Sequence, residues 1–344
     1  MKPIPISVVG LGRTGWRNHL MNLQTLPDLF RIAAVCDPMA SRRAEAETTF
    51  GCASHETLED LLENADTEWV VIATPQMLHR TQVIAALRAG KHVICEKPMA
   101  LTLADAEAMA EVARETGRFL SVFHSLRYAP DFELVQSLVD SGKLGRLLMI
   151  KIYRNGFGRR WDWQTLKKFG GGNLSNLGPH VLDHALCLMG HANPGVVARA
   201  EAAVTLGDAD DHVKILLHAP DAPLMDIELS SADAMGAERW KIYGTTGGLS
   251  GDGTTFRSRF FDPALLPVRE VVETPPADRS YDKETLPWVE ENFTISSEAA
   301  NRQLPVAYYS ELHAALQAGN PPPITTEHSL AVMRIMQKVQ ENAI

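Results

Sequence analysis

A glycine-rich turn between a strand pattern and a helix pattern constrains the fold of this chain most strongly. The apolar run at residues 4–9 ends at Gly10-Leu11-Gly12-Arg13-Thr14-Gly15, which has the spacing G-x-G-x-x-G. The first glycine permits a tight turn, the second lets the backbone approach a pyrophosphate, and the third lets the helix pack on the strand. The helix start, at Arg13 and Thr14, offers free N–H groups to phosphates. The turn therefore predicts a dinucleotide-binding βαβ unit.

An acidic residue follows the second strand pattern. Residues 30–36 read as a strand and end at Asp37, about twenty residues past the last glycine, where a carboxylate accepts hydrogen bonds from the adenosine ribose. Its charge would repel a 2′-phosphate, which favours NAD. Arg42 and Arg43 follow closely and are able to accommodate that phosphate, so NADP stays open as the cofactor.

Strands and helices continue to alternate up to residue 123. Strand patterns at 69–73, 92–95 and 119–123 are separated by helix patterns, which predicts a doubly wound parallel sheet, a Rossmann domain, over residues 1–123. Ligands of such sheets bind at the carboxyl ends of the strands. Thr74, Pro75 and His79 follow the strand at 69–73, so we expect them beside the cofactor.

The next strand pattern runs into Glu96-Lys97-Pro98. Pro98 disfavours helical geometry at Lys97, and a lysine at the carboxyl end of a parallel strand points into the ligand crevice. A surface lysine beside a turn is the simpler explanation. The dinucleotide turn and a second motif near residue 180 favour a functional Lys97.

After His124 the pattern changes to strands of period two. Residues 147–153, 213–217 and 225–229 alternate apolar and polar side chains, as in an antiparallel sheet with one buried face. Shorter strands are expected at 238–243, 248–251 and 256–261, a surface loop at 274–285, and helices at 130–141, 305–317 and 327–340. We expect an α+β domain over residues 124–344 with a large, mainly antiparallel open sheet. Its last helix is expected to pack back on the first domain, and its uncovered sheet face to form a homodimer or homotetramer.

Composition excludes several other classes of protein. Hydrophobic residues make up 45% of the 344 residues, and no apolar run approaches the ~18 residues of a membrane helix. The net charge is −9 and basic residues do not cluster, so we expect no nucleic-acid partner and no membrane partner. The four cysteines are scattered, which favours a reduced, cytoplasmic protein. No His, Cys or acidic cluster has metal-ligand spacing, so no metal is expected.

The second motif is the run from Gly170 to Asp183. Asn176, His180 and Asp183 fall at i, i+4 and i+7, on one face of a helix expected to start near 175 or 176. An aspartate beside His180 would fix its tautomer for proton transfer, although a capped helix with purely local hydrogen bonds is the simpler reading. The preceding loop is our candidate for substrate selection, with its tryptophans alternatively serving only as anchors; it carries Tyr153, Arg154, Arg159, Trp161, Asp162 and Trp163. His124 and Arg127 are expected to border the site.

These motifs together resemble the Gfo/Idh/MocA family, which includes glucose–fructose oxidoreductase and inositol dehydrogenase. The resemblance covers almost the whole chain and is carried by the glycine turn, Asp37, Ala73-Thr74-Pro75, Glu96-Lys97-Pro98 and the run from Gly170 to Asp183. It implies a nicotinamide-dependent enzyme acting on a sugar or cyclitol carbon, with its second sheet over the nicotinamide. It also implies Lys97 as the catalytic lysine, His180 as proton donor or acceptor, and Thr74 and Glu96 as cofactor neighbours. Many members have Asp where this chain has Asn176, which cannot take a proton.

The chemistry implied is hydride transfer between the nicotinamide and a carbinol or carbonyl carbon. A buried Lys97 has its pKa lowered and can take the hydroxyl proton, with Asp183 orienting His180 and with Asn176 and Arg127 contacting substrate. Two alternatives remain at this point. One is an NAD-dependent glycosidase with a transient internal redox step. The other is a non-catalytic NAD(H)-binding sensor.

Overall fold

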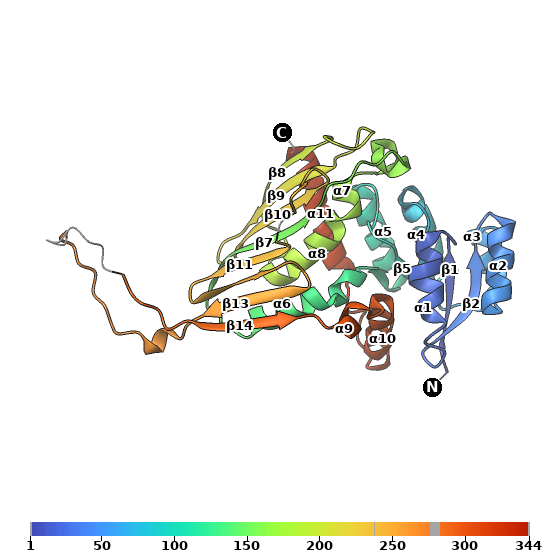
Figure 1. The fold of residues 1–344 in the computed structure, drawn as a ribbon. Coiled ribbons are helices and arrows are strands. Elements are labelled where there is room, and N and C mark those ends of the chain that lie inside the picture. Colours follow the sequence, from blue (N-terminus) through green and yellow to red (C-terminus); the bar gives the residue numbers. More distant parts are fainter. Residues whose placement is uncertain (1, 237, 276–282, 343–344) are drawn as a thin grey trace.

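The computed structural model describes residues 2–236, 238–275 and 283–342 and builds two sheets (Figure 1). One is six-stranded and parallel. The other has eight strands and is antiparallel except for one parallel pair, β7 with β10. This is the predicted fold class. Within the described segments, no helix has both the length and the apolar character needed to cross a membrane.

The first sheet has the order β3-β2-β1-β4-β5-β6, the order of dinucleotide-binding domains. Its central strands are buried on both faces, as expected for a parallel sheet covered by helices. Thr57 and Thr102 cap the helices that follow them by accepting hydrogen bonds from Asp60 N and Asp105 N. The strands are β1 (Ile4–Val9), β2 (Phe30–Cys36), β3 (Ala53–His55), β4 (Trp69–Ile72), β5 (His92–Cys95) and β6 (Leu120–Val122). The helices are η1 (Gly15–Leu20), α1 (Met21–Leu23), α2 (Ala40–Phe50), α3 (Leu58–Asn64), η2 (Gln76–Leu78), α4 (His79–Arg88) and α5 (Leu103–Thr116).

The second sheet has the order β14-β13-β12-β11-β7-β10-β9-β8. The expected alternation holds in its centre, where Met225, Ile227 and Leu229 are buried. Pattern reading misses β8, which has no period of two, β14, which is largely polar and exposed, and the three-residue β3. The strands are β7 (Leu147–Asn155), β8 (Gly195–Glu201), β9 (His212–His218), β10 (Leu224–Ser230), β11 (Trp240–Gly244), β12 (Gly247–Gly251), β13 (Thr255–Phe260) and β14 (Val289–Thr294).

The expected surface loop at 274–285 lies partly outside the described residues, which omit 276–282. Its described ends have no helix or strand, and the described residues that follow β13 and precede β14 extend away from the body of the protein (orange in Figure 1).

Helices cover one face of the second sheet, and one expected helix is divided. The helix predicted to start near residue 175 consists of α7 (Asn173–Asn176) and α8 (Gly178–Met189). Pro179 has no N–H to donate to the carbonyl of Ser175, so the regular ladder starts only after it. The others are η3 (Ser125–Tyr128), α6 (Pro130–Asp140), η4 (Trp163–Thr165), η5 (Lys167–Phe169), η6 (Pro263–Leu265), α9 (Ser297–Ala300), α10 (Leu304–Gln317) and α11 (Thr326–Asn342).

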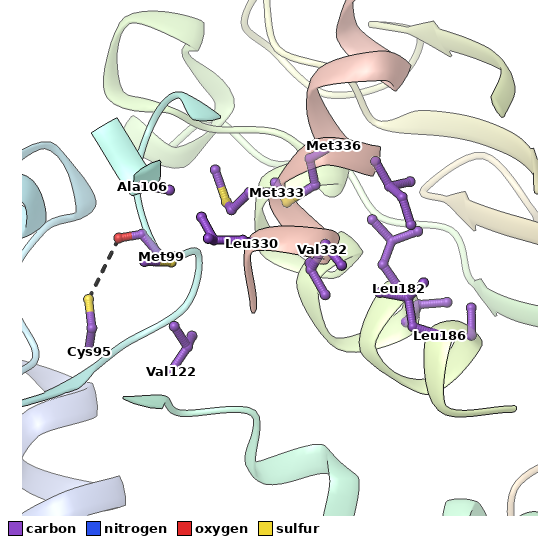
Figure 2. Close-up of a cluster of buried hydrophobic side chains, with 14 of the residues drawn as sticks. Cys95, Met99, Ala106, Val122, Leu182, Leu186, Leu330, Val332, Met333 and Met336 are labelled. Atoms are coloured by element: carbon purple, nitrogen blue, oxygen red, sulfur yellow. Dashed lines mark hydrogen bonds between the residues drawn. The ribbon is translucent and has the colours of Figure 1, made fainter. Parts of the chain in front are cut away.

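The C-terminal helix α11 lies between the two halves of the chain. Leu330 and Met333 face the region of Met99 and Ala106, while Val332 and Met336 face α8 (Figure 2). Helix α11 contacts α5 and β6 on one side and α8 and β8 on the other. One continuous hydrophobic core therefore holds the end of β5 against the start of α8.

Candidate active site

The glycine turn leaves space for a dinucleotide. Gly10 has a φ of +91°, and a Cβ there would lie 2.8 Å from the Ala73 carbonyl oxygen, while a Cβ at Gly15 would collide with the Gly10 carbonyl. A Cβ at Gly12 would meet no protein atom within 4 Å. Gly12 borders a hollow of about 310 Å³ that is also lined by Arg13, Arg17 and Arg42. Open backbone and positive charge fit the phosphates of NAD(P).

Asp37 fastens this turn to the end of β2. Its carboxylate is buried and accepts hydrogen bonds from Leu11 N at 2.8 Å and Met39 N at 2.9 Å. Arg42 Nη1 lies 3.3 Å from Asp37 Oδ2 and offsets part of its charge. The predicted ribose acceptor thus also orders the phosphate-binding backbone.

Lys97 makes a contact between the two halves of the chain. It follows β5, and its Nζ donates a hydrogen bond to the Asn176 carbonyl oxygen at 3.0 Å. Burial lowers the pKa of Lys97, while the adjacent Glu96 carboxylate opposes that change. The backbone of Asn176, rather than its amide side chain, makes this contact. The sequence predicts a lysine with a lowered pKa after this strand, and the structure has Lys97 in that position.

Glu96 lies behind Lys97 and faces the protein interior. Its Oε2 accepts a hydrogen bond from Lys97 N at 3.1 Å, and its Oε1 lies 3.1 Å from His19 Nε2. His19 Nδ1 in turn lies 2.7 Å from the hydroxyl of Tyr309 on α10. Burial raises the pKa of Glu96, but the His19 hydrogen bond and the neighbouring positive charges outweigh it and the pKa is lowered. The Glu96 carboxylate thus contacts the backbone of Lys97 and the His19 ring, and its expected place beside the cofactor stays a prediction.

Sequence reasoning missed His19 and Tyr309, which are 290 residues apart. A histidine one turn into the first helix has no local signal of its partner. Only the packing of α10 against α1 brings the two rings together.

His79 does not line the hollow at the glycine turn, and its expected place beside the cofactor stays a prediction. Its ring is buried, with Nδ1 3.0 Å from the Pro98 carbonyl oxygen and Nε2 3.0 Å from that of Thr74. His79 thus joins the ends of β4 and β5. Thr74 Oγ1 donates a hydrogen bond to Gln82 Oε1 at 2.6 Å, and Pro75 follows it at the start of η2.

His180 is neutral and close to Lys97. Burial and the Lys97 charge lower the pKa of His180 well below its usual value. Its Nδ1 is buried and has no hydrogen-bond partner among the described residues, and neither has either ring nitrogen of buried His124. The two rings are perpendicular, with centroids 6.4 Å apart.

Asp183 does not orient His180, which corrects the sequence prediction. It is fully buried and accepts a bidentate pair of hydrogen bonds from Arg127, one of them from Nε at 3.2 Å, and its Oδ1 lies 2.8 Å from His328 Nε2. Burial raises the pKa of Asp183, but His124, His328 and Arg127 outweigh this and lower it. Arg127, expected to contact substrate, is thus engaged in an ion pair.

The same cluster brings potential metal ligands together that lie apart in sequence. Asp183, Cys187 and His328 each offer one ligand atom, and these atoms lie within 4.8 Å of one another. Because the Arg127 guanidinium already occupies the Asp183 carboxylate, we assign the cluster to an ion pair between α8, η3 and α11.

The predicted substrate loop carries exposed tryptophans and contacts the first half of the chain. Tyr153 belongs to the polar face of the second sheet, where its hydroxyl donates to Asp226 at 3.0 Å, and it also lines a hollow at the carboxyl end of β7, so its role in binding substrate stays a prediction. Trp161 and Trp163 are 78% and 50% exposed. The loop returns to the first half at Gln76, whose Nε2 donates to the Phe169 carbonyl at 2.9 Å.

A dinucleotide turn and a half-buried lysine at a strand end, beside a second sheet with its own helices, define an NAD(P)-dependent oxidoreductase. Residues 4–124 match the family model described as an oxidoreductase family with an NAD-binding Rossmann fold, and residues 132–250 match the GFO/IDH/MocA C-terminal domain. The chain belongs to the Gfo/Idh/MocA family, as its resemblance implied.

Individual relatives agree with this assignment. The chain is 31% identical to an uncharacterised oxidoreductase of Schizosaccharomyces pombe, over 72% of this chain and 70% of that protein. It is 27% identical to a scyllo-inositol 2-dehydrogenase (NADP⁺) of Bacillus subtilis, over 99% and 94% of the two chains. A solved structure of the WlbA dehydrogenase from Bordetella pertussis, in complex with NADH and UDP-GlcNAcA, has a TM-score of 0.80 at 21% identity and covers 99% of this chain and 96% of its own.

Proposed function

We propose that this protein transfers hydride between NAD(H) and the carbinol or carbonyl carbon of a sugar, sugar derivative or cyclitol. The observation that carries the proposal is Lys97: a half-buried amine with a lowered pKa, which follows β5 and donates a hydrogen bond to the backbone of α7. The inositol dehydrogenase among the relatives, and the sugar nucleotide bound to WlbA, support this substrate class.

Lys97 performs the proton transfer in this mechanism. A bound nicotinamide supplies the hydride acceptor or donor. In the oxidation direction, neutral Lys97 Nζ takes the hydroxyl proton while hydride leaves the carbinol carbon, so that alcohol and NAD⁺ become carbonyl and NADH. Neutral His180 gives a second hydrogen bond to the same oxygen, and the amide of Asn176 binds a neighbouring hydroxyl.

Further elements of the proposal concern the cofactor and assembly. Asp37 favours NAD over NADP, and Arg42 reduces the difference in affinity between the two cofactors. Residues 1–123 form the cofactor domain and residues 124–344 the substrate domain. Trp161 and Trp163 cover the bound sugar. The polar open face of the second sheet mediates a homodimer or homotetramer of a cytoplasmic protein.

The test is NADH formation from NAD⁺ with a panel of sugars and cyclitols, followed with substrates that carry deuterium on the carbinol carbon. We expect NADH to accumulate in proportion to product, with deuterium transferred to the nicotinamide. Cleavage of the glycosidic bond of a glycoside in the panel, without net NADH, would instead indicate a glycosidase. Tight NAD binding without reduction by any panel member would indicate a sensor.

A further inference from the structure

We propose that a hollow at the carboxyl end of β7 binds an anionic group of the substrate, a carboxylate or a phosphate, through Arg154 and Arg239. This inference rests on the function proposed above and narrows its substrate class. The hollow has a volume of about 630 Å³, within the usual range of small-molecule sites. Polar side chains border it, among them Asn155 and Asn173.

Arg154 is a buried cation with weak compensation. Its side chain is 10% exposed. Its Nη2 is 3.6 Å from Asp131 Oδ2, beyond hydrogen-bond distance, and its Nη1 makes a long 3.4 Å contact with the carbonyl oxygen of Tyr153. Its guanidinium lies 5.6 Å from the Trp240 ring centroid. A buried charge normally has a partner, so this placement points to a ligand that supplies one.

Asp131 does not neutralise the pair of arginines. The same Asp131 Oδ2 already accepts hydrogen bonds from Arg239 Nη1 at 2.9 Å and from Trp240 Nε1 at 3.0 Å. Two guanidinium groups therefore share one carboxylate. Burial and the Arg239 charge lower the pKa of Arg154 to about 10, so it stays charged at neutral pH. The guanidinium fork suits bidentate binding of carboxylate or phosphate oxygens.

One carboxylate, Asp252, lies among the lining residues, and its oxygens are committed to a turn. They accept hydrogen bonds from Thr254 N and from the backbone and side chain of Thr255. Asp252 therefore does not supply the missing partner of Arg154.

The hollow lies close to the proposed reaction centre. Asn173 and Leu177 line it, and between them Asn176 holds Lys97 Nζ. Beyond Arg154, the Trp240 ring stacks on that of His184, one helical turn from His180 on α8. A sugar acid or sugar phosphate would thus place its anionic group at Arg154 and its carbinol carbon beside Lys97.

The experiment measures binding to the NAD⁺-loaded protein by calorimetry at constant ionic strength. The probes are D-glucose, D-glucuronate and glucose 6-phosphate, so that the neutral parent is compared with each anion. We expect at least one anion to bind about 10- to 100-fold more tightly than glucose, as for a charge-assisted bidentate contact. Whichever anion binds more tightly than glucose, glucuronate or glucose 6-phosphate, shows whether the site prefers a carboxylate or a phosphate.

Substitutions of the two arginines test whether the preference for anions arises in this hollow. Arg154→Gln should abolish the preference, Arg154→Lys should keep part of it, and Arg199→Gln, at an exposed arginine on β8 paired with Glu201, should keep all of it. Arg239→Gln, on a half-exposed side chain, gives a second test if Arg154→Gln fails to fold. Equal binding of all three probes, or a preference that survives both Arg154→Gln and Arg239→Gln, overturns the proposal. Anion preference without hydride transfer would leave the anion site in place and refute the proposed reaction.

Discussion

Replacing Asp183 by asparagine separates a structural role from a catalytic one. In the structure this carboxylate joins α8 to η3 through Arg127 and to α11 through His328. Removing one partner of a buried ion pair costs about 3–5 kcal/mol, because the other charge is left uncompensated. Unfolding entropy is about 2.1 cal mol⁻¹ K⁻¹ per residue, hence about 0.7 kcal mol⁻¹ K⁻¹ for 344 residues. We therefore expect Asp183→Asn to lower Tm by about 4–7 °C.

Scanning calorimetry across pH tests this expectation. The folded-state pKa of Asp183 is lowered, so its stabilising effect is present above its unfolded pKa of about 3.9 and is lost as the pH falls below that value. The difference in Tm between wild type and Asp183→Asn should be constant near neutral pH and shrink below about pH 4. Asp140→Asn, at an exposed position on α6, is the control. An unchanged Tm together with lost activity would refute the reasoning and restore Asp183 as the partner of His180.

Three further predictions concern the cofactor and substrate residues. Glu96→Gln removes the negative charge that raises the Lys97 pKa, so the acidic limb of the pH–rate profile for oxidation, where Lys97 must be deprotonated, should move to lower pH by roughly one pH unit, and exposed Glu107→Gln should not move it. Fluorescence titration should show tighter binding of NAD(H) than of NADP(H), and the difference between the two affinities should be smaller in Asp37→Ser. Equal or tighter NADP(H) binding by the wild type would contradict this prediction. Trp163→Ala should raise KM and leave NAD affinity unchanged, whereas a joint fall in NAD affinity and Tm would show that Trp163 only anchors its loop.

Local patterns predicted the fold and the strand ends well. The glycine turn, Asp37 and Lys97 follow the carboxyl ends of β1, β2 and β5 in one parallel sheet, and topology alone gathers such ends at one edge of a sheet. The partial burial of Lys97 also follows from its position after an apolar strand. These conclusions need no knowledge of distant contacts.

Predictions that depended on side-chain partners were less successful. The spacing of His180 and Asp183 is correct for a shared helix face, yet Asp183 binds Arg127 and His328, which come from other elements. His79 and Glu96 likewise turn toward carbonyl groups and His19 in the interior. Tyr153 follows strand alternation onto the polar face of the sheet. Helical and strand periods give the face of an element, whereas the partner on that face depends on tertiary packing.

Single-turnover hydride transfer at saturating NAD⁺ tests the central claim most directly. Lys97→Met is compared with Lys91→Met, since both lysines flank β5 and each donates from Nζ to a backbone carbonyl, but Lys91 lies at the opposite end of the strand. The account predicts that Lys97→Met binds NAD⁺ normally and slows hydride transfer by roughly 10²–10⁴-fold, while Lys91→Met transfers hydride at the wild-type rate. Hydride transfer at the wild-type rate in Lys97→Met would contradict the account.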